Sequence, residues 1–119
     1  MQTVNIAEKF GKIQDYWNPR VLGELNHFAV KAVKLKGEFV WHHHDNEDEL
    51  FLVVKGTLHM KFRDHESIAH EGEFIIVPHG VEHQPVANEE VHLILLEPRT
   101  TLNTGNVTNE RTVRQLERI

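Results

Sequence analysis

The 119-residue chain contains no cysteine. This absence excludes disulfide bonds, thiolate zinc sites and cysteine nucleophiles. No segment approaches the roughly 18 consecutive apolar residues that a membrane-spanning helix requires. The first residues also lack the basic end and apolar stretch of a secretion signal. We therefore expect a cytoplasmic protein with no membrane partner.

The chain also has little positive charge. Thirteen basic and 18 acidic side chains give a formal net charge of −5. Nucleic acids and anionic lipids both demand a concentrated basic face, so this balance argues against either as the main partner. The length has room for one domain with one core, which we expect to span residues 1–119.

The pattern of apolar residues predicts one helix at the start of the chain. Asn5 with Glu8 three residues later resembles a capping box. Apolar residues then recur with helical spacing as far as Trp17, and Asn18-Pro19 ends the run. We therefore predict a helix over about residues 3–17.

From about residue 25 to 97 the chain consists of short strand-like runs separated by glycine and proline. The clearest run is Leu58–Arg63, in which apolar and polar residues alternate. The other predicted strands are Phe28–Leu35, Phe39–His44, Glu49–Val54, Phe74–Val77 and Val91–Glu97. Many short strands without intervening helices predict an all-β barrel or jelly roll. The polar tail, about residues 98–119, could dock on this barrel or fray.

Histidine is unusually frequent, with ten in the chain and three in a row at His42–His44. Side chains alternate along a strand, so His42 and His44 face one way and His43 the other. Glu49 begins the next predicted strand, where it shares a face with Phe51 and Val53. Two imidazoles and a carboxylate at the mouth of an apolar interior are suitable ligands for a divalent metal ion.

A second segment, from Gly72 to His83, contains the turn Pro78-His79-Gly80. Proline fixes φ and glycine permits positive φ, so this turn is tightly specified. It delivers His83 to a defined place, where we expect it to be the fourth metal ligand.

Together the two segments resemble the two motifs of the cupin superfamily. The matching positions are Gly37, His42, His44, Glu49 and Gly56, then Gly72, Pro78, Gly80 and His83. The gap from Gly37 to His42 is one residue shorter than usual, and Ala87 replaces the family's asparagine. The likeness is to stand-alone, single-domain bacterial cupins, often labelled mannose-6-phosphate-isomerase-like. It implies a double-stranded β-helix, which is a jelly-roll barrel.

Three imidazoles and one carboxylate suit iron, manganese, nickel, cobalt or zinc, and leave an octahedral ion two open positions. We therefore expect a metal-dependent enzyme, dioxygenase- or isomerase-like, whose partner is a small molecule. The alternative is a small-ligand-binding or sensor protein without turnover. A second titratable group inside the barrel would favour the enzyme, and Glu82 and His92 are the candidates.

Two further expectations concern the outer surface. Lys31, Lys34, Lys61 and Arg63 read as exterior strand residues, although inward ones could bind an anionic substrate. The runs Glu49–Val54 and Val91–Glu97 are apolar on both faces. A lone barrel would leave one of those faces wet, so we predict a homodimer, with the N-terminal helix as the competing cover.

Overall fold

The chain folds around one long strand, β7 (His83–Pro98), in a computed structural model that describes residues 1–119. One helix, α1 (Ile6–Phe10), precedes the strands. The other strands are β1 (Arg20–Leu25), β2 (Phe28–Glu38), β3 (Glu49–Lys55), β4 (Leu58–Phe62), β5 (Glu66–Ala69) and β6 (Phe74–Val77). No helix is long and apolar enough to cross a membrane.

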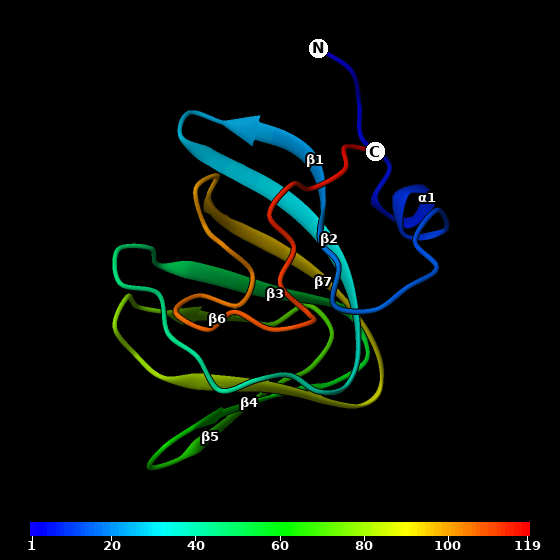
Figure 1. The fold of residues 1–119 in the computed structure, drawn as a ribbon. Helices are drawn as coiled ribbons and strands as arrows, with labels where there is room; N and C mark the ends of the chain where they lie inside the picture. The colour runs from blue at the N-terminus through cyan, green and yellow to red at the C-terminus, as the bar shows by residue number, and fades with distance from the viewer.

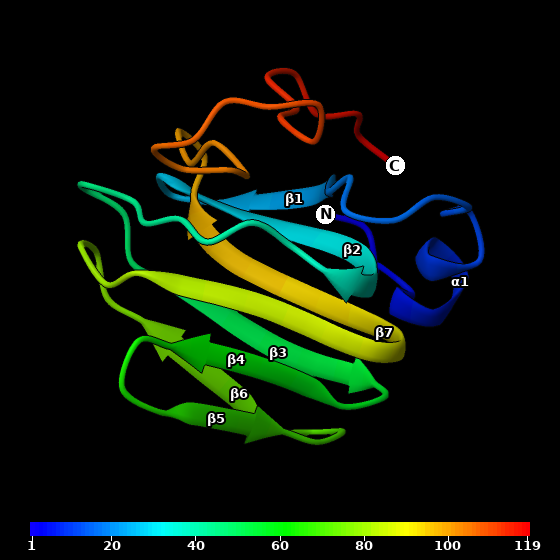
Figure 2. The ribbon, with the colours of Figure 1, turned by 60° about the horizontal axis from the view of Figure 1, so that its bottom comes forward.

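All strand pairs are antiparallel, and β7 joins them into a barrel (Figures 1 and 2). Its first residues, His83–Val86, pair with β4, and its later residues pair with β2 and β3. The strand order is β1-β2-β7-β3-β6, with β4 on β7 and β5 on β4. Because β7 pairs with β4 near its start and with β2 and β3 further along, the sheet closes around a single interior. The predicted all-β jelly roll is confirmed.

One end of the barrel interior is entirely apolar. We call the group formed by Val53, Leu58, Ala69 and Val91 the apolar end of the barrel. Each of these side chains is at most 1% exposed. They pack with the other members of one large buried cluster. This cluster supplies the driving force for folding, since burial of apolar surface dominates the stability of small domains.

The N-terminal helix is shorter than predicted. Asn5 caps it by accepting a hydrogen bond from the Glu8 backbone N–H. The helix ends at Phe10, and Gly11 caps it. The remaining residues up to Trp17 form turns, and Trp17 itself has a φ of +61°. Glycine is a poor helix former, which explains the early end.

The outer face of the sheet is partly covered by this N-terminal segment. Phe10 and Ile13 are 2% and 1% exposed and pack against Ala32 and Ile94. Of the four residues with helical spacing, Phe10, Ile13 and Trp17 are buried as predicted, whereas Ile6 is 40% exposed. The competing cover proposed from the sequence exists, and it covers β2 and β7.

Three strand predictions need correction. Residues 39–44 make no regular strand, and only His42 forms an isolated bridge, to His83. β1 and β5 were not predicted, and β7 begins at His83 instead of Val91. The polar stretch between His83 and Val91 concealed the first half of β7, because its alternation is weak.

The C-terminal tail docks on the barrel and contains no helix. Thr101 and Thr104 are buried, at 7% and 0% exposure. Near its end, Arg118 forms a parallel bridge with Val21 of β1. Figure 2 shows the tail running across one side of the sheet towards α1. The open choice between docking and fraying is thus resolved in favour of docking.

Candidate metal centre

Backbone hydrogen bonds bring the two histidine segments together. The His42 N–H donates to the His83 carbonyl at 3.1 Å, and the His83 N–H donates to the His42 carbonyl at 2.9 Å. The Gly80 N–H donates to the His44 carbonyl at 2.7 Å. Gly80 has a φ of +79°, as the predicted turn requires. Residues some 40 positions apart are therefore held side by side by main-chain contacts.

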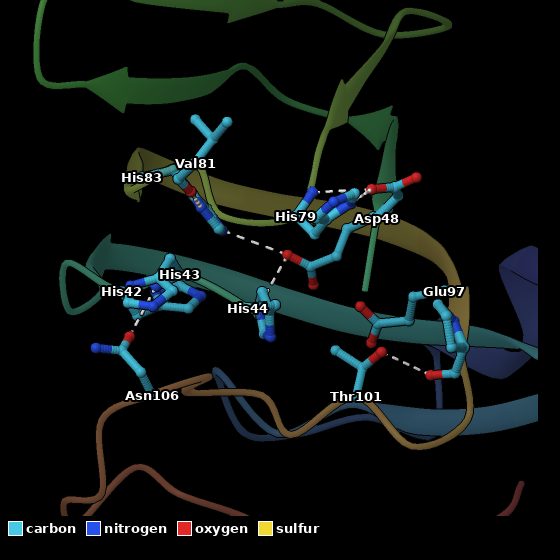
Figure 3. A network of polar contacts seen from close by, with 12 residues as sticks. His42, His43, His44, Asp48, His79, Val81, His83, Glu97, Thr101 and Asn106 are labelled. Carbon is cyan, nitrogen blue, oxygen red and sulfur yellow. Dashed lines mark hydrogen bonds and ion pairs between the residues drawn. The ribbon is translucent and has the colours of Figure 1, made fainter. Parts of the chain in front are cut away.

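His42, His44, Glu49 and His83 form one buried group. Each residue offers one ligand atom, and these atoms lie within 4.8 Å of one another. The four residues are 3%, 4%, 5% and 1% exposed, in that order. Figure 3 shows His42, His44 and His83 around a common space, with the Glu97 side chain pointing towards it.

The polar atoms of this group converge without satisfying one another. Glu49 Oε1 lies 3.0 Å from His44 Nε2 and 3.3 Å from His83 Nε2. None of these three atoms makes a hydrogen bond of acceptable geometry, although all are buried. Buried polar atoms are nearly always partnered, so three orphans aimed at one place need a shared partner. A divalent cation fits this requirement, because imidazole and carboxylate are its usual ligands.

Main-chain carbonyls orient two of the rings. His42 Nδ1 lies 2.9 Å from the Val40 carbonyl, and His83 Nδ1 lies 2.9 Å from the Val81 carbonyl. A carbonyl can only accept, so each Nδ1 carries the hydrogen and each Nε2 keeps a free lone pair. The ring orientation and tautomer that metal binding requires are thus set in advance.

The electrostatics of the group favour ligands without protons. Burial, followed by the neighbouring His83, lowers the pKa of His42 to about 4, so this imidazole is neutral at pH 7. Burial alone would raise the pKa of Glu49. The neighbouring Glu97, His44 and His83 side chains outweigh burial and hold that pKa well below its usual range. Both residues are therefore in the state that coordinates a metal.

Two neighbouring histidines lie outside the group, and His43 faces away from it as predicted. The His43 side chain is 28% exposed and its Nε2 lies 3.0 Å from Asp45. His79 is largely exposed and pairs with Asp48. Strand-like alternation thus describes the direction of His43 correctly, even though residues 39–44 form no regular strand.

An apolar cavity of about 40 Å³ adjoins the candidate ligands. Phe51, Leu93 and Leu95 line it, together with His42, Glu49 and Glu97. This volume exceeds the minimum of about 10–15 Å³ that one water molecule requires. The cavity therefore has room for a small group beside the candidate ligands.

The prediction that Lys31 is an exterior residue is wrong. Lys31 and Glu97 are each 2% exposed and form an ion pair of 2.8 Å between Nζ and Oε1. The period-two pattern could have revealed both. Lys31 lies on the same face of its strand as the buried residues Ala29 and Val33. Glu97 lies on the same face as the buried residue Leu95.

The two candidates for a second titratable group are also wrong. The Glu82 side chain is 48% exposed and pairs with Arg63 on the surface. His92 lies on the outer face, where it stacks on Phe10 and pairs with Glu90. Glu97 is the second carboxyl in the barrel, and it lines the same cavity as Glu49.

The C-terminal tail closes over the histidine segment. The Asn106 side chain accepts a hydrogen bond from the His43 N–H at 2.8 Å, and the Asn106 N–H donates to the His43 carbonyl at 3.0 Å. Gly105 lies so close that an added Cβ would sit 2.2 Å from the His43 carbonyl oxygen. Asn103 contributes to the cavity wall. The tail is therefore part of the surroundings of the site.

Comparisons with known proteins agree with this architecture. A family model described as "Cupin domain" matches residues 30–98. The crystal structure of a cupin-2 domain containing protein from Shewanella frigidimarina NCIMB 400 is 44% identical, with a TM-score of 0.80. The match covers 82% of this chain and 95% of that one.

Two further relatives extend the comparison. Protein NMB1881 from Neisseria meningitidis is 31% identical, with a TM-score of 0.76, over 82% of this chain and 99% of that one. The uncharacterized protein YdbB of Bacillus subtilis (strain 168) is 34% identical over 64 residues, which are 53% of this chain. The match covers 57% of that curated relative's length. None of these three names specifies a reaction.

Proposed function

The chain belongs to the cupin domain family, and on that premise we propose that it is a metal-dependent enzyme acting on a small oxygenated organic molecule. The divalent ion would be held by His42, His44, Glu49 and His83. When bound, such an ion supplies Lewis-acid or redox chemistry, of the kind that dioxygenase and isomerase reactions use.

One observation carries the proposal: three buried ligand atoms converge and lack any partner within the protein. His44 Nε2, Glu49 Oε1 and His83 Nε2 are all of this kind. A group that served only packing would satisfy its own atoms, because burying unpartnered polar atoms costs free energy. Four protein ligands also leave coordination positions for a substrate, whereas structural zinc sites are usually closed.

The remaining residues of the site have separate tasks in this proposal. The Val40 and Val81 carbonyls hold two imidazole rings in place. The apolar lining from Phe51, Leu93 and Leu95 limits the water beside the ion. Glu97 provides the second carboxyl that distinguishes an enzyme interior from a simple binding pocket, since proton transfer needs a group beyond the ligands.

The test begins with elemental analysis of the purified protein. We expect about one divalent ion per chain. The protein is then stripped, reloaded separately with iron, manganese, nickel, cobalt or zinc, and screened for oxygen consumption and isomerisation of small oxygenated substrates. Turnover should vanish on stripping and return with one of these ions. Undiminished turnover by the stripped protein would contradict the proposal, and tight binding without any conversion would favour the sensor hypothesis.

The assembly and the location of the protein stay predictions. Phe74 and Ile76 of β6 are 59% and 55% exposed, and they lie opposite Leu52 and Leu50 of β3. This outward apolar surface, which α1 does not cover, supports the proposed homodimer. Sedimentation should give a dimer that Phe74→Asp disrupts; a monomer at every concentration would contradict it. We keep the cytoplasm as the proposed location, and cell fractionation tests it.

A further inference from the structure

The barrel interior contains an ion pair that the candidate ligand set does not use. Lys31 lies on β2 and Glu97 on β7, and both side chains point inward. Ala29 pairs with Glu97 across these strands, which places Lys31 two residues further along the same face. The 2.8 Å contact between Nζ and Oε1 occupies only one oxygen of the Glu97 carboxyl.

The other Glu97 oxygen faces the metal centre. Leu50 pairs with Leu96, so continuing the register by one residue places Glu49 opposite Glu97. Both residues line the same cavity. Glu97 Oε2 is buried and makes no well-aligned hydrogen bond. Glu97 is absent from the set of converging ligand atoms, so it lies one layer outside them.

The two carboxyls lie side by side. Residues directly opposite in an antiparallel pair have Cβ atoms about 4.5–5.5 Å apart, and Glu49 and Glu97 are both buried and line one cavity. Lys31 fixes one Glu97 oxygen, while the other has no partner of its own. Lys31, Glu97 and Glu49 therefore form one polar chain that leads to the candidate ligand atom.

Stability alone does not explain a buried pair at this place. Replacing a buried ion pair by apolar side chains of similar size is often neutral or stabilising. The neighbouring inward residues on these two strands are apolar, namely Val33, Leu93 and Leu95. An apolar pair would fit the same lining, so the charged pair has another role.

We propose that Glu97, anchored by Lys31, is a positioning residue for Glu49. Glu49 Oε1 already points towards His44 and His83. Glu97 binds the remaining oxygen, Oε2, and so keeps Glu49 a one-oxygen ligand that leaves coordination positions open. This inference rests on the proposed metal centre, and it adds two residues that orient it. Without Glu97, the Glu49 carboxylate is free to turn and occupy a position meant for a substrate.

Metal affinity and the visible spectrum of bound Co²⁺ test this inference without any substrate. In Lys31→Met/Glu97→Leu both charges leave together, so neither is stranded in the interior. We expect Co²⁺ to bind about 10–100-fold more weakly, the usual loss when a second-layer partner is removed. The Co²⁺ absorption bands should also change in intensity, because the coordination number changes.

A conservative variant separates positioning from simple packing. In Glu97→Gln the amide oxygen accepts from Lys31, while the amide N–H donates to Glu49, so the polar chain persists. We expect its Co²⁺ affinity and spectrum to stay close to those of the natural protein. The control Lys61→Met/Glu66→Leu removes two charges from a cross-strand pair on β4 and β5 that does not line the cavity, and should change neither.

The possible results distinguish the positioning role of Glu97 from the metal centre itself. Unchanged affinity and spectrum in Lys31→Met/Glu97→Leu would overturn the positioning role and leave the proposed function intact. If Glu97→Gln binds Co²⁺ as weakly as the double variant does, the hydrogen-bonded chain from Lys31 to Glu49 is contradicted. If the double variant does not fold, Glu97→Asp replaces it, because the shorter side chain keeps the charge but is too short to contact Glu49. A Co²⁺ affinity equal to that of the natural protein in this variant would also overturn the inference. Failure of the natural protein to bind Co²⁺ would contradict the metal centre itself.

Discussion

The same strands build two opposite kinds of interior in this barrel. β3 contributes Glu49 to the candidate metal centre and, four residues later, Val53 to the apolar end. β7 contributes His83 and Glu97 to the first and Val91 to the second. All of these side chains are nearly inaccessible to solvent. The apolar end contains no unpartnered polar side-chain atom, whereas the candidate metal centre contains four: three candidate ligand atoms and Glu97 Oε2.

This contrast separates stability from function within one fold. Burial of apolar side chains stabilises the barrel at one end. Buried unpartnered polar atoms cost stability at the other, which is typical of sites kept for a ligand. Changes at the apolar end should therefore alter folding and leave metal binding intact, whereas changes at the metal centre should do the reverse.

The largest effect is expected from the ligands themselves. His42→Ala, His44→Ala and His83→Ala should each weaken metal binding by more than the roughly 100-fold that loss of a second-layer partner causes. His43→Ala is the matched control, because its ring lies outside the group and pairs with Asp45. Elemental analysis after dialysis measures occupancy. Equal loss in all four variants would overturn the ligand assignment.

Leu58→Ala tests the other end of the comparison. Leu58 is 0% exposed, so we expect a destabilisation of about 2–5 kcal/mol in urea denaturation. The metal stoichiometry of the folded protein should not change. The control Ile68→Ala removes a comparable side chain that is 49% exposed on β5, and should cost far less. A loss of metal in Leu58→Ala without unfolding would show that the two ends are not separable.

The sequence predicted which residues form the converging buried group better than it predicted the residues around them. Local geometry decides the members of this group: alternation separates His43 from His42, and the Pro-x-Gly turn delivers His83. Lys31 and Glu97 are 66 residues apart, and only the pairing of β2 with β7 makes each a partner for the other. A lysine in a strand is normally solvated, so its inward direction needs that tertiary partner.

The extent of the N-terminal helix and the position of the C-terminal tail could not be predicted for similar reasons. The apolar spacing up to Trp17 correctly selected Phe10 and Ile13 as buried, but packing on β2 and β7 decides their burial and does not require a continuous helix. The tail could not be placed from its sequence, because it is held by scattered polar contacts such as those of Asn106 with His43.

Acid should weaken the metal-free protein through the metal centre. The pKa of His42 falls from 6.5 to about 4 on folding, because burial and the nearby His83 disfavour its charged form. Below pH 6.5, His42 therefore binds a proton in the unfolded chain but stays neutral in the folded chain until the pH approaches 4. The stability contributed by neutral His42 is complete above pH 6.5 and is lost as the pH falls towards 4, by about 3 kcal/mol at most.

Urea denaturation at pH 7, 5.5 and 4.5 measures this loss. Glu97, whose pKa is raised by burial and by Glu49, acts in the opposite sense, since its folded form holds a proton that the unfolded form releases above pH 4.5. The comparison is therefore made with His42→Gln, which removes only the histidine contribution. Its stability should fall less steeply with acid than that of the natural protein, and an identical slope would refute the assignment. Leu58→Ala should keep the natural slope.

The smallest effect is expected where the tail meets the metal centre. Gly105 has a φ of +58°, and an alanine Cβ there would lie 2.2 Å from the His43 carbonyl oxygen and 3.0 Å from His42 Cδ2. The left-handed conformation alone costs alanine about 1–2 kcal/mol. The chain can relieve the contact by moving the tail away, which breaks the bond from the Asn106 N–H to His43. Hydrogen exchange at Asn106 should therefore become at least about tenfold faster in Gly105→Ala, since 1.4 kcal/mol corresponds to a factor of ten.

Two controls accompany this prediction. The Val53 N–H, which donates to the Glu73 carbonyl beside the apolar end, should keep its exchange rate. Gly23→Ala is the control, because its Cβ would meet nothing within 4 Å. Unchanged exchange at Asn106 would mean that the close approach of Gly105 does not hold the tail, and that its polar contacts suffice.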